Sequence, residues 1–412
     1  MPDPKKLKQY AALIIAGINL KEGQEVVIRI PVEHQEFAHL LQKTAYENHA
    51  GRVVIRYEDM AASRNDLYYG DEKALSRVDE SELLRAREEQ ARGSAYIHII
   101  SEIPGIYKGC DEEKSGRIRR SRSLGLKPVQ EYTTKSLGQW TVAALPNPVW
   151  ARKVFPDIRD DQKAVEALYN AIFETVCLNR KGNPVRNWRK HGETIQNHCR
   201  ILNEYQFKAL HFRNSIGTDL LVPLVRNHIW GGNSELALQT GQMFDPNIPT
   251  EEVFTTPDCR KTEGTVVASR PLVENGHVID RFGFTFHKGK VVEYHAAKGK
   301  KTLESILSSD RGSVRLGEVA LVPYDSPISR MNLMFYETLF DENAACHLAL
   351  GASYPTCMEG GETMSDRELR ALGSNVSSVH VDFMFGTEDL MADGITKDGS
   401  EVPVFRNGSF VF

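Results

Sequence analysis

The 412-residue sequence lacks the features that mark several large classes of protein. No apolar run approaches the roughly 20 residues of a membrane helix, and the N-terminal stretch has no small-residue cleavage pattern of a signal peptide. No GxGxxG or P-loop motif follows a predicted strand, so nucleotide binding has no support. The formal net charge of −4 gives no overall field that attracts a polyanion. We therefore expect neither a membrane nor a nucleic acid as partner.

Cysteine is scarce and scattered along the chain. The six cysteines form no CxxC pair and no disulfide-framework spacing, which argues against zinc ribbons and redox motifs. Such cysteines suit a reducing compartment. Together with the missing signal peptide, this pattern predicts a cytoplasmic protein.

The patterns that are present indicate two domains, since the chain is too long for one ordinary core. Residues 1–100 alternate between helical and strand patterns, which predicts an α/β domain with a small, mostly parallel sheet. Residues 106–200 read as helical with proline breaks. After residue 200, strands separated by turn residues predict a β-rich α+β domain, with hairpins at Lys288-Gly289 and Asn407-Gly408. We place an N-terminal α/β domain with a helical extension over 1–200 and a C-terminal catalytic domain over 201–412.

Candidate metal ligands lie in the β-rich half. In NVSSVHVDFMFG, residues 375–386, Val381 and Phe383 fall on one face of a predicted strand, and His380 and Asp382 fall on the other. Side chains at positions i and i+2 point the same way, so the imidazole and the carboxylate can reach one cation. The alternative is a solvated strand face.

Further oxygen and nitrogen donors lie at breaks between predicted segments. Glu251 and Glu252 are adjacent in an extended segment, where their side chains diverge, so we expect only one of them to meet the same ion. Glu318 begins an apolar strand, where an unpaired carboxylate is costly. His347 lies in an apolar setting, and Tyr354 follows it. Two Glu, two His and one Asp are the ligand inventory of a two-metal hydrolase.

Each of these residues also has a structural explanation. Tandem glutamates are common on surfaces and at helix starts, and Glu318 could pair with Arg315 or Arg330. His347 and Tyr354 could be ordinary core residues. Spacing in the sequence leaves these alternatives open.

Several long segments occur in an order that resembles the thermophilic-type metalloaminopeptidases, the group that includes aminopeptidase T, aminopeptidase S and aminopeptidase II. They are NIPTEEVFTTPD, KTEGTVVASRPL, LGEVALVP, LFDENAACHLALG and VHVDFMFG. The resemblance covers essentially the whole chain, and it implies a homodimer of two-domain subunits that releases N-terminal amino acids from peptides with a free N-terminus. It also implies two divalent ions per subunit, with Tyr354 at or beside them and with metal ligands at Glu252, Glu318, His347, His380 and Asp382.

We therefore expect a metal-dependent aminopeptidase in which two cations activate a water molecule. Glu251 is the predicted proton carrier, and Tyr354 is predicted to stabilise the developing oxyanion. Oxygen and nitrogen ligands accept zinc, cobalt and manganese alike, so the sequence specifies neither the native metal nor the preferred N-terminal residue. The alternatives are a two-metal hydrolase of a non-peptide amide or a phosphoester, and a non-catalytic metal-binding scaffold. Arg330 alone offers a basic contact in DSPISRMN, which weighs against a phosphoesterase.

Overall fold

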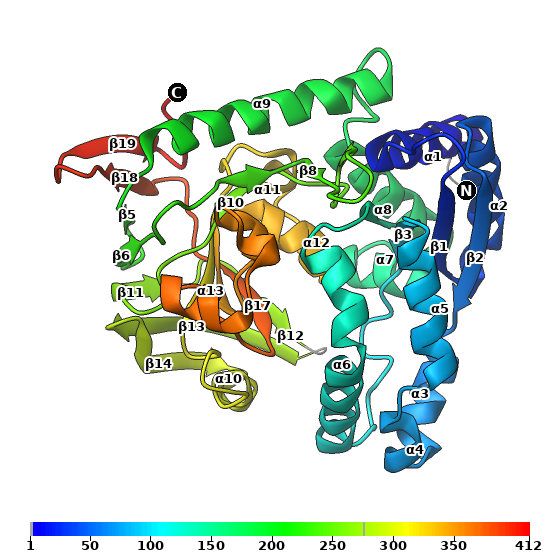
Figure 1. Cartoon of the computed structure of the whole chain (residues 1–412), viewed down its shortest axis with the longest axis horizontal. Helices are drawn as coiled ribbons and strands as arrows, with labels where there is room; N and C mark the ends of the chain where they lie inside the picture. The colour runs from blue at the N-terminus through cyan, green and yellow to red at the C-terminus, as the bar shows by residue number, and fades with distance from the viewer. Residues whose placement is uncertain (1–2, 275–276) are drawn as a thin grey trace. The chain divides into compact units, whose positions relative to one another are not determined.

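The computed structural model describes residues 3–274 and 277–412, which divide into two compact units. One unit comprises the residues up to Lys190 together with Ser234–Pro249, and the other comprises His191–Asn233 and Thr250–Phe412. Figure 1 follows the elements of both units along the chain. The domain boundary predicted at residue 200 remains a prediction, because compactness does not establish that either unit folds alone.

The first unit is built on a parallel sheet with the strand order β2-β1-β3-β4. Its strands are β1 (Glu25–Pro31), β2 (Arg52–Glu58), β3 (Ala95–Ile100) and β4 (Trp140–Ala144). The predicted parallel sheet is therefore present. The prediction that residues 106–200 are helical is wrong at β4, where the run WTVAA of aromatic and β-branched residues indicates a strand that the flanking helical patterns concealed.

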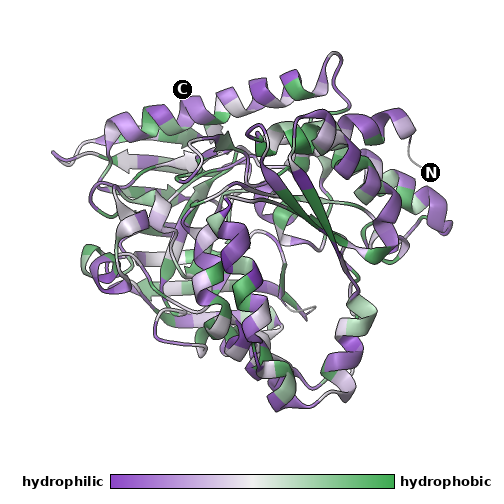
Figure 2. Cartoon of the chain, turned by 45° about the vertical axis from the view of Figure 1, so that its right-hand side comes forward, coloured by the Kyte–Doolittle hydropathy of each residue, from purple (hydrophilic) through white to green (hydrophobic). Residues whose placement is uncertain are grey.

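Helices accompany this sheet along the chain. They are α1 (Pro4–Ile18), α2 (Gln35–Glu47), α3 (Met60–Tyr69), α4 (Glu72–Ser76), α5 (Glu80–Ala91), α6 (Glu112–Thr134), α7 (Pro148–Val154) and α8 (Asp161–Thr175), with the 3₁₀ turn η1 (Val32–His34). The short strands β8 (Glu235–Leu236) and β9 (Met243–Phe244) pair within the segment that returns to this unit. Figure 2 shows the strands of the parallel sheet as mainly hydrophobic, whereas the helices mix hydrophobic and hydrophilic positions. A parallel sheet needs both faces covered, and amphipathic helices provide the cover.

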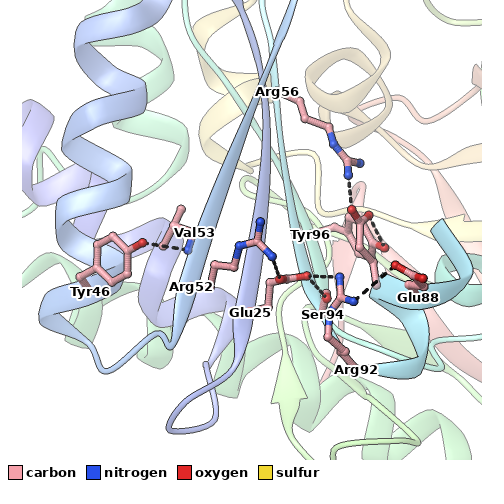
Figure 3. Close-up of polar contacts among 10 residues, drawn as sticks. Glu25, Tyr46, Arg52, Val53, Arg56, Glu88, Arg92, Ser94 and Tyr96 are labelled. Atoms are coloured by element: carbon pink, nitrogen blue, oxygen red, sulfur yellow. Dashed lines mark hydrogen bonds and ion pairs between the residues drawn. The ribbon is translucent and has the colours of Figure 1, made fainter. Parts of the chain in front are cut away.

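A network of charged side chains lies at the amino end of the parallel strands (Figure 3). Glu25, at the start of β1, is 8% exposed and accepts hydrogen bonds from Ser94 Oγ at 2.9 Å and from Arg92 Nη2 at 3.0 Å. Arg52, at the start of β2, adds a contact at 3.4 Å. Burial opposes ionisation of Glu25, but the Ser94 and Arg92 hydrogen bonds outweigh it and lower the pKa of this carboxyl.

Replacing Glu25 by Gln tests this network. The variant should lose about 1–3 kcal/mol of unfolding free energy at pH 7, because Ser94 and Arg92 lose a charged acceptor. The folded pKa of Glu25 lies below its unfolded value, so its contribution is present above the unfolded pKa and is lost as the pH falls through the folded pKa. Urea unfolding at pH 7 and in acid should show a gap between wild type and variant that narrows in acid. Glu22→Gln, three residues earlier and exposed, is the matched control and should show no gap at either pH.

The second unit contains two sheets. The five-stranded sheet has the order β17-β16-β15-β10-β7 and consists of β7 (Gly231–Gly232), β10 (Val253–Thr255), β15 (Leu316–Leu321), β16 (His347–Gly351) and β17 (His380–Met384). The larger sheet consists of β5 (Ala209–Arg213), β6 (Asp219–Pro223), β11 (Glu263–Val267), β12 (Leu272–Glu274), β13 (His277–His287), β14 (Lys290–Lys298), β18 (Met391–Ile395), β19 (Glu401–Arg406) and β20 (Ser409–Phe410).

Short helices connect the strands of this unit, and one long helix precedes them. They are α9 (Pro184–Tyr205), which begins in the first unit, α10 (Lys300–Leu307), α11 (Pro327–Met331), α12 (Thr338–Asp341), α13 (Asp366–Leu372) and the 3₁₀ turns η2 (Glu342–Ala344), η3 (Pro355–Cys357) and η4 (Gly361–Thr363). Both predicted hairpins are present: β13 and β14 meet at Lys288-Gly289, and β19 and β20 meet at Asn407-Gly408. All four turn residues have positive φ, as a type I′ turn requires.

None of the helices within residues 3–274 and 277–412 combines the length and the apolar character that a membrane span needs.

Candidate metal centre

The five predicted metal ligands come together on neighbouring strands of the five-stranded sheet. Glu318 lies on β15, His347 begins β16, and His380 and Asp382 lie on β17, while Glu252 directly precedes β10. Since these four strands are adjacent in the order β17-β16-β15-β10, ligands separated by up to 130 residues in sequence become neighbours in space.

The register places these side chains on one face of the sheet. Glu318 pairs with Ala349, and Ala349 pairs with Asp382, so these three residues form one row across β15, β16 and β17. Residues opposite each other in an antiparallel pair project to the same face, as do residues two apart on one strand. His347 and His380 therefore join the same face. Ala349 lies between the two carboxylates and, with only a methyl group, leaves the space above it to them.

The other face of the same strands belongs to the hydrophobic core. Its members alternate with the ligands and are Val253, Val319, Leu321, Leu348, Leu350, Val381 and Phe383. Each is nearly or fully buried. The alternation predicted from the sequence for residues 380–383 is thus confirmed, and core residues alternate with candidate ligands on three further strands.

The donor atoms form two adjoining groups. Glu252, Glu318 and His347 offer one atom each within 4.8 Å of one another, and Glu318, His380 and Asp382 do the same. His347 Nε2 lies 3.0 Å from Glu252 Oε2 and 3.8 Å from Glu318 Oε1. His380 Nε2 lies 3.0 Å from Glu318 Oε2 and 3.3 Å from Asp382 Oδ1. The two oxygens of Glu318 therefore face different groups.

Main-chain carbonyls orient both imidazole rings. His380 Nδ1 lies 2.7 Å from Ala352 O, and His347 Nδ1 lies 3.3 Å from Ala345 O. A carbonyl can only accept, so each ring carries its hydrogen on Nδ1 in this arrangement, and Nε2 faces the carboxylates. Metal-binding histidines are commonly fixed in this way.

Burial and mutual repulsion control the ionisation of this centre. Burial raises the pKa of Glu318, and the charges of Glu252 and Asp382 raise it further. For His347, burial disfavours the charged ring, but the surrounding carboxylates, Glu252 foremost, outweigh burial and raise the pKa to about 10. Asp382 and Glu318 raise the pKa of His380 in the same way. The centre is a concentration of negative charge in a poorly solvated place, which a cation would stabilise.

The donor set fits a divalent metal. Glu252 Oε2 and Asp382 Oδ1 are buried, and neither oxygen accepts a hydrogen bond of good geometry from the described residues. Within residues 3–274 and 277–412, the ion pairs of Glu252, Glu318 and Asp382 are with histidines, and no Lys or Arg pairs with them. The alternative in which Arg315 or Arg330 neutralises Glu318 is wrong, since these arginines donate to the main-chain oxygens of Cys259 and Asp325.

Tyr354 and Glu251, the predicted catalytic residues, lie in different surroundings. The Tyr354 hydroxyl is 3.4 Å from His380 Nε2, beside the second donor group. Glu251 Oε2 lies 3.6 Å from His191 Nε2 of α9, and Glu251 N donates to Asn343 Oδ1 at 2.7 Å. Glu251 belongs to neither donor group.

Glu342 is a residue of this centre that the sequence analysis missed. It lies in η2, and burial raises its pKa well above the usual range, with further increases from the charges of Glu252 and Asp382. The turn η2 also lies beside β17, the strand of His380 and Asp382, so Glu342 is a further carboxylate near the second donor group. The acidic pair Asp341-Glu342, separated from an apolar run only by Asn343, was the available signal, since a charge in such a position requires a partner.

Oxygen and nitrogen donors in two adjoining groups on one face of a sheet suit a divalent metal ion. Comparison with known proteins identifies the family. The family model described as thermophilic metalloprotease (M29) matches residues 3–410, and the chain belongs to that family.

Relatives of the chain are aminopeptidases. It is 40% identical to aminopeptidase PepS of Streptococcus thermophilus and 41% identical to aminopeptidase 2 of Geobacillus stearothermophilus, in each case over 99% of this chain and 98% of the relative. The solved structure of wild-type AmpT from Thermus thermophilus superposes with a TM-score of 0.91 at 37% identity and covers 99% of both chains. The chain is a metalloaminopeptidase, that is, a hydrolase of the exopeptidase type, and the resemblance inferred from its motifs is confirmed.

Substitutions on the two faces of β17 should have opposite effects. His380→Ala and Asp382→Ala should leave a folded protein with less bound metal and at least about 10²-fold lower activity, because each removes a donor from the polar face. Val381→Asp should instead cost about 3–5 kcal/mol of stability, because it places an uncompensated charge in the core. Bound metal, turnover and thermal unfolding of the three variants check this. Near-normal turnover of either alanine variant at limiting metal would contradict the assignment.

Proposed function

We propose that the chain binds two divalent cations and uses them to release N-terminal amino acids from peptides. The observation that carries the proposal is the position of Glu318, which belongs to both donor groups and directs one carboxylate oxygen to each. In two-metal hydrolases a carboxylate of this kind bridges ions about 3.5–4 Å apart. In this assignment Glu252 and His347 bind one ion, His380 and Asp382 bind the other, and Glu318 binds both.

Charge balance supports two ions rather than one. Glu252, Glu318, Glu342 and Asp382 carry four negative charges when ionised, and a histidine that binds a metal is neutral. Two divalent cations match this charge, whereas one would leave a buried excess of negative charge. Zinc, cobalt and manganese all suit the donors.

When bound, the cations would polarise the scissile carbonyl and lower the pKa of a water molecule from about 15.7 to about 7. Side chains of the protein would make the other contributions to the reaction. Tyr354, whose hydroxyl reaches the second donor group, would donate a hydrogen bond to the oxygen on which negative charge develops. The sheet holds the donors in place, so little reorganisation accompanies the reaction.

Two carboxylates are candidates for moving a proton from the attacking water to the leaving amine. Glu251 is the candidate expected from the sequence, since it adjoins a ligand and points elsewhere. Glu342 is the second candidate, because its turn lies beside β17 and the charges of Glu252 and Asp382 raise its pKa, while Glu251 contacts His191 and Asn343. General acid–base help of this kind contributes about 10²–10⁴-fold.

The substrate is proposed to be a peptide with a free α-amine, as the names of the relatives indicate for those proteins. A homodimer and a cytoplasmic location remain proposals from the sequence. All six cysteines are free, with five buried, which is consistent with a thiol-reducing setting.

Glutamine variants at the three glutamates separate ligand from proton carrier. Glu252→Gln should lower metal occupancy, and added metal should partly restore activity. The proton carrier, whether Glu251 or Glu342, should keep full occupancy as Gln but turn over about 10²–10⁴-fold more slowly.

Bound metal and turnover, measured together in each variant, decide the assignment. Metal loss in Glu251→Gln with retention in Glu252→Gln would mean that these two roles are reversed. Normal turnover of both Glu251→Gln and Glu342→Gln would exclude both carboxylates as the carrier.

Specificity for the free amine is tested with paired peptides. The enzyme should cleave a peptide that has a free N-terminus and leave its N-acetylated form intact, because acetylation removes the charge and the lone pair that a metal or a carboxylate would bind. Mass spectrometry of both reactions gives the answer. Efficient cleavage of the blocked peptide would indicate an endopeptidase or an amidase.

A further inference from the structure

One turn contacts both nitrogens of His380. The turn of residues 351–354 begins at the last residue of β16, and within it Ala352 O lies 2.7 Å from His380 Nδ1, while the Tyr354 hydroxyl lies 3.4 Å from His380 Nε2. The conformation of this turn therefore controls both the tautomer of His380 and the position of the Tyr354 hydroxyl.

Asn375 holds this turn from the segment before β17. The residue is 5% exposed, and the two N–H groups of Nδ2 are shared among Gly351 O at 2.6 Å, Gly312 O at 2.9 Å and Arg315 O at 3.2 Å. Its main chain binds the same turn, since Asn375 N donates to Ser353 Oγ at 2.9 Å and Ser353 N donates to Asn375 O at 2.8 Å. Asn375 thus connects the turn to the strand that carries His380 and Asp382.

The main chain of this turn also packs closely against β15 and against the segment before β17. Gly351 has φ +105°, and a Cβ there would lie 2.0 Å from Val379 O. A Cβ on Gly317 would lie 2.2 Å from Ala352 O, and Gly317 occupies the β-bulge of β15 directly before Glu318. Ala352 O, which accepts from His380, therefore packs against the β-bulge that directly precedes Glu318.

We propose that Asn375 is a positioning residue for His380, which belongs to only one of the two donor groups, that of Glu318, His380 and Asp382. It holds Ala352 O against the Nδ1–H of His380, so that the Nε2 lone pair faces the cation. This inference rests on the proposed ligand set. The other group does not use this support, because His347 Nδ1 faces Ala345 O instead.

Cobalt titration tests this asymmetry. Chelator-treated protein would be titrated with Co²⁺, with bound metal measured by elemental analysis and absorbance. In Asn375→Ala, one Co²⁺ should bind about 10–100-fold more weakly, the usual effect of losing an outer support of a ligand, and the other should bind as in wild type. His347→Ala identifies the other site, since it should weaken the Co²⁺ that Asn375→Ala retains.

Asn147→Ala is the matched control. Asn147 is also a buried amide with several hydrogen bonds, to Ser101, to Glu102 O and from Trp150 N, but it lies in the first unit. Its variant should lose stability and bind both Co²⁺ ions normally. Ser353→Ala removes a single hydrogen bond between the turn and Asn375, and it should weaken the binding of the same Co²⁺ by a smaller factor than Asn375→Ala. This variant keeps the test available if Asn375→Ala does not fold.

A proton resonance provides a readout that needs no metal. The Nδ1–H signal of His380, assigned by its absence in His380→Gln, should shift or exchange faster in Asn375→Ala and Ser353→Ala but not in Asn147→Ala. An unchanged signal, or equal weakening of both Co²⁺ ions, would overturn the positioning role. Wild type that binds fewer than two Co²⁺ per chain would contradict the proposed two-ion function instead, and the resonance would still test the role of Asn375.

Discussion

The structure of the second unit depends on the alternation of core and polar residues along four neighbouring antiparallel strands, which the β-bulge at Gly317 interrupts in β15. Each strand gives every second residue to the hydrophobic core and the intervening residues to the polar centre, so Val381 packs inward between His380 and Asp382. A slip of one residue would exchange the two faces and bury the candidate ligands in the core. The register of the core therefore fixes the geometry of the centre, and no separate element is needed to assemble it.

This arrangement places several carboxylates where ionisation is least favourable. Attraction and repulsion between charges strengthen as the dielectric falls, so Glu318 and Glu342 are strongly affected by Glu252 and Asp382. The rigidity of the sheet prevents the side chains from relaxing away from one another. A cation bound in such a centre would reduce the repulsion between its carboxylates. The hydrophobic face of the same strands contributes the stability that offsets this repulsion.

Local patterns in the sequence predicted much of this unit but could not predict its pairings. Alternation identified the strand of His380 and Asp382, and Asn-Gly and Lys-Gly identified two hairpins, because these signals act over a few residues. Strand β10 pairs with β15 across about 60 residues of sequence. The hydrophobic periodicity of a single strand does not encode such a pairing. Glu252 could therefore be chosen over Glu251 only by family resemblance. Glu342 was missed because it lies in a 3₁₀ turn without periodicity, and β4 was missed because helical patterns surround a five-residue strand.

The two units contain shielded carboxylates with two different kinds of ionic partner. In the first unit, buried Glu25 meets Arg92 and Ser94, and buried Glu89 meets Arg56, so each charge is neutralised by side chains of the same unit. In the second unit, Glu252 and Glu318 are buried and Asp382 is partly buried, yet within the described residues their ionic partners are histidines, whose rings can give up a proton to make way for a metal. Burial alone therefore does not distinguish the two kinds of site. The distinction lies in whether the neutralising charge is permanent, as in arginine, or exchangeable, as in histidine.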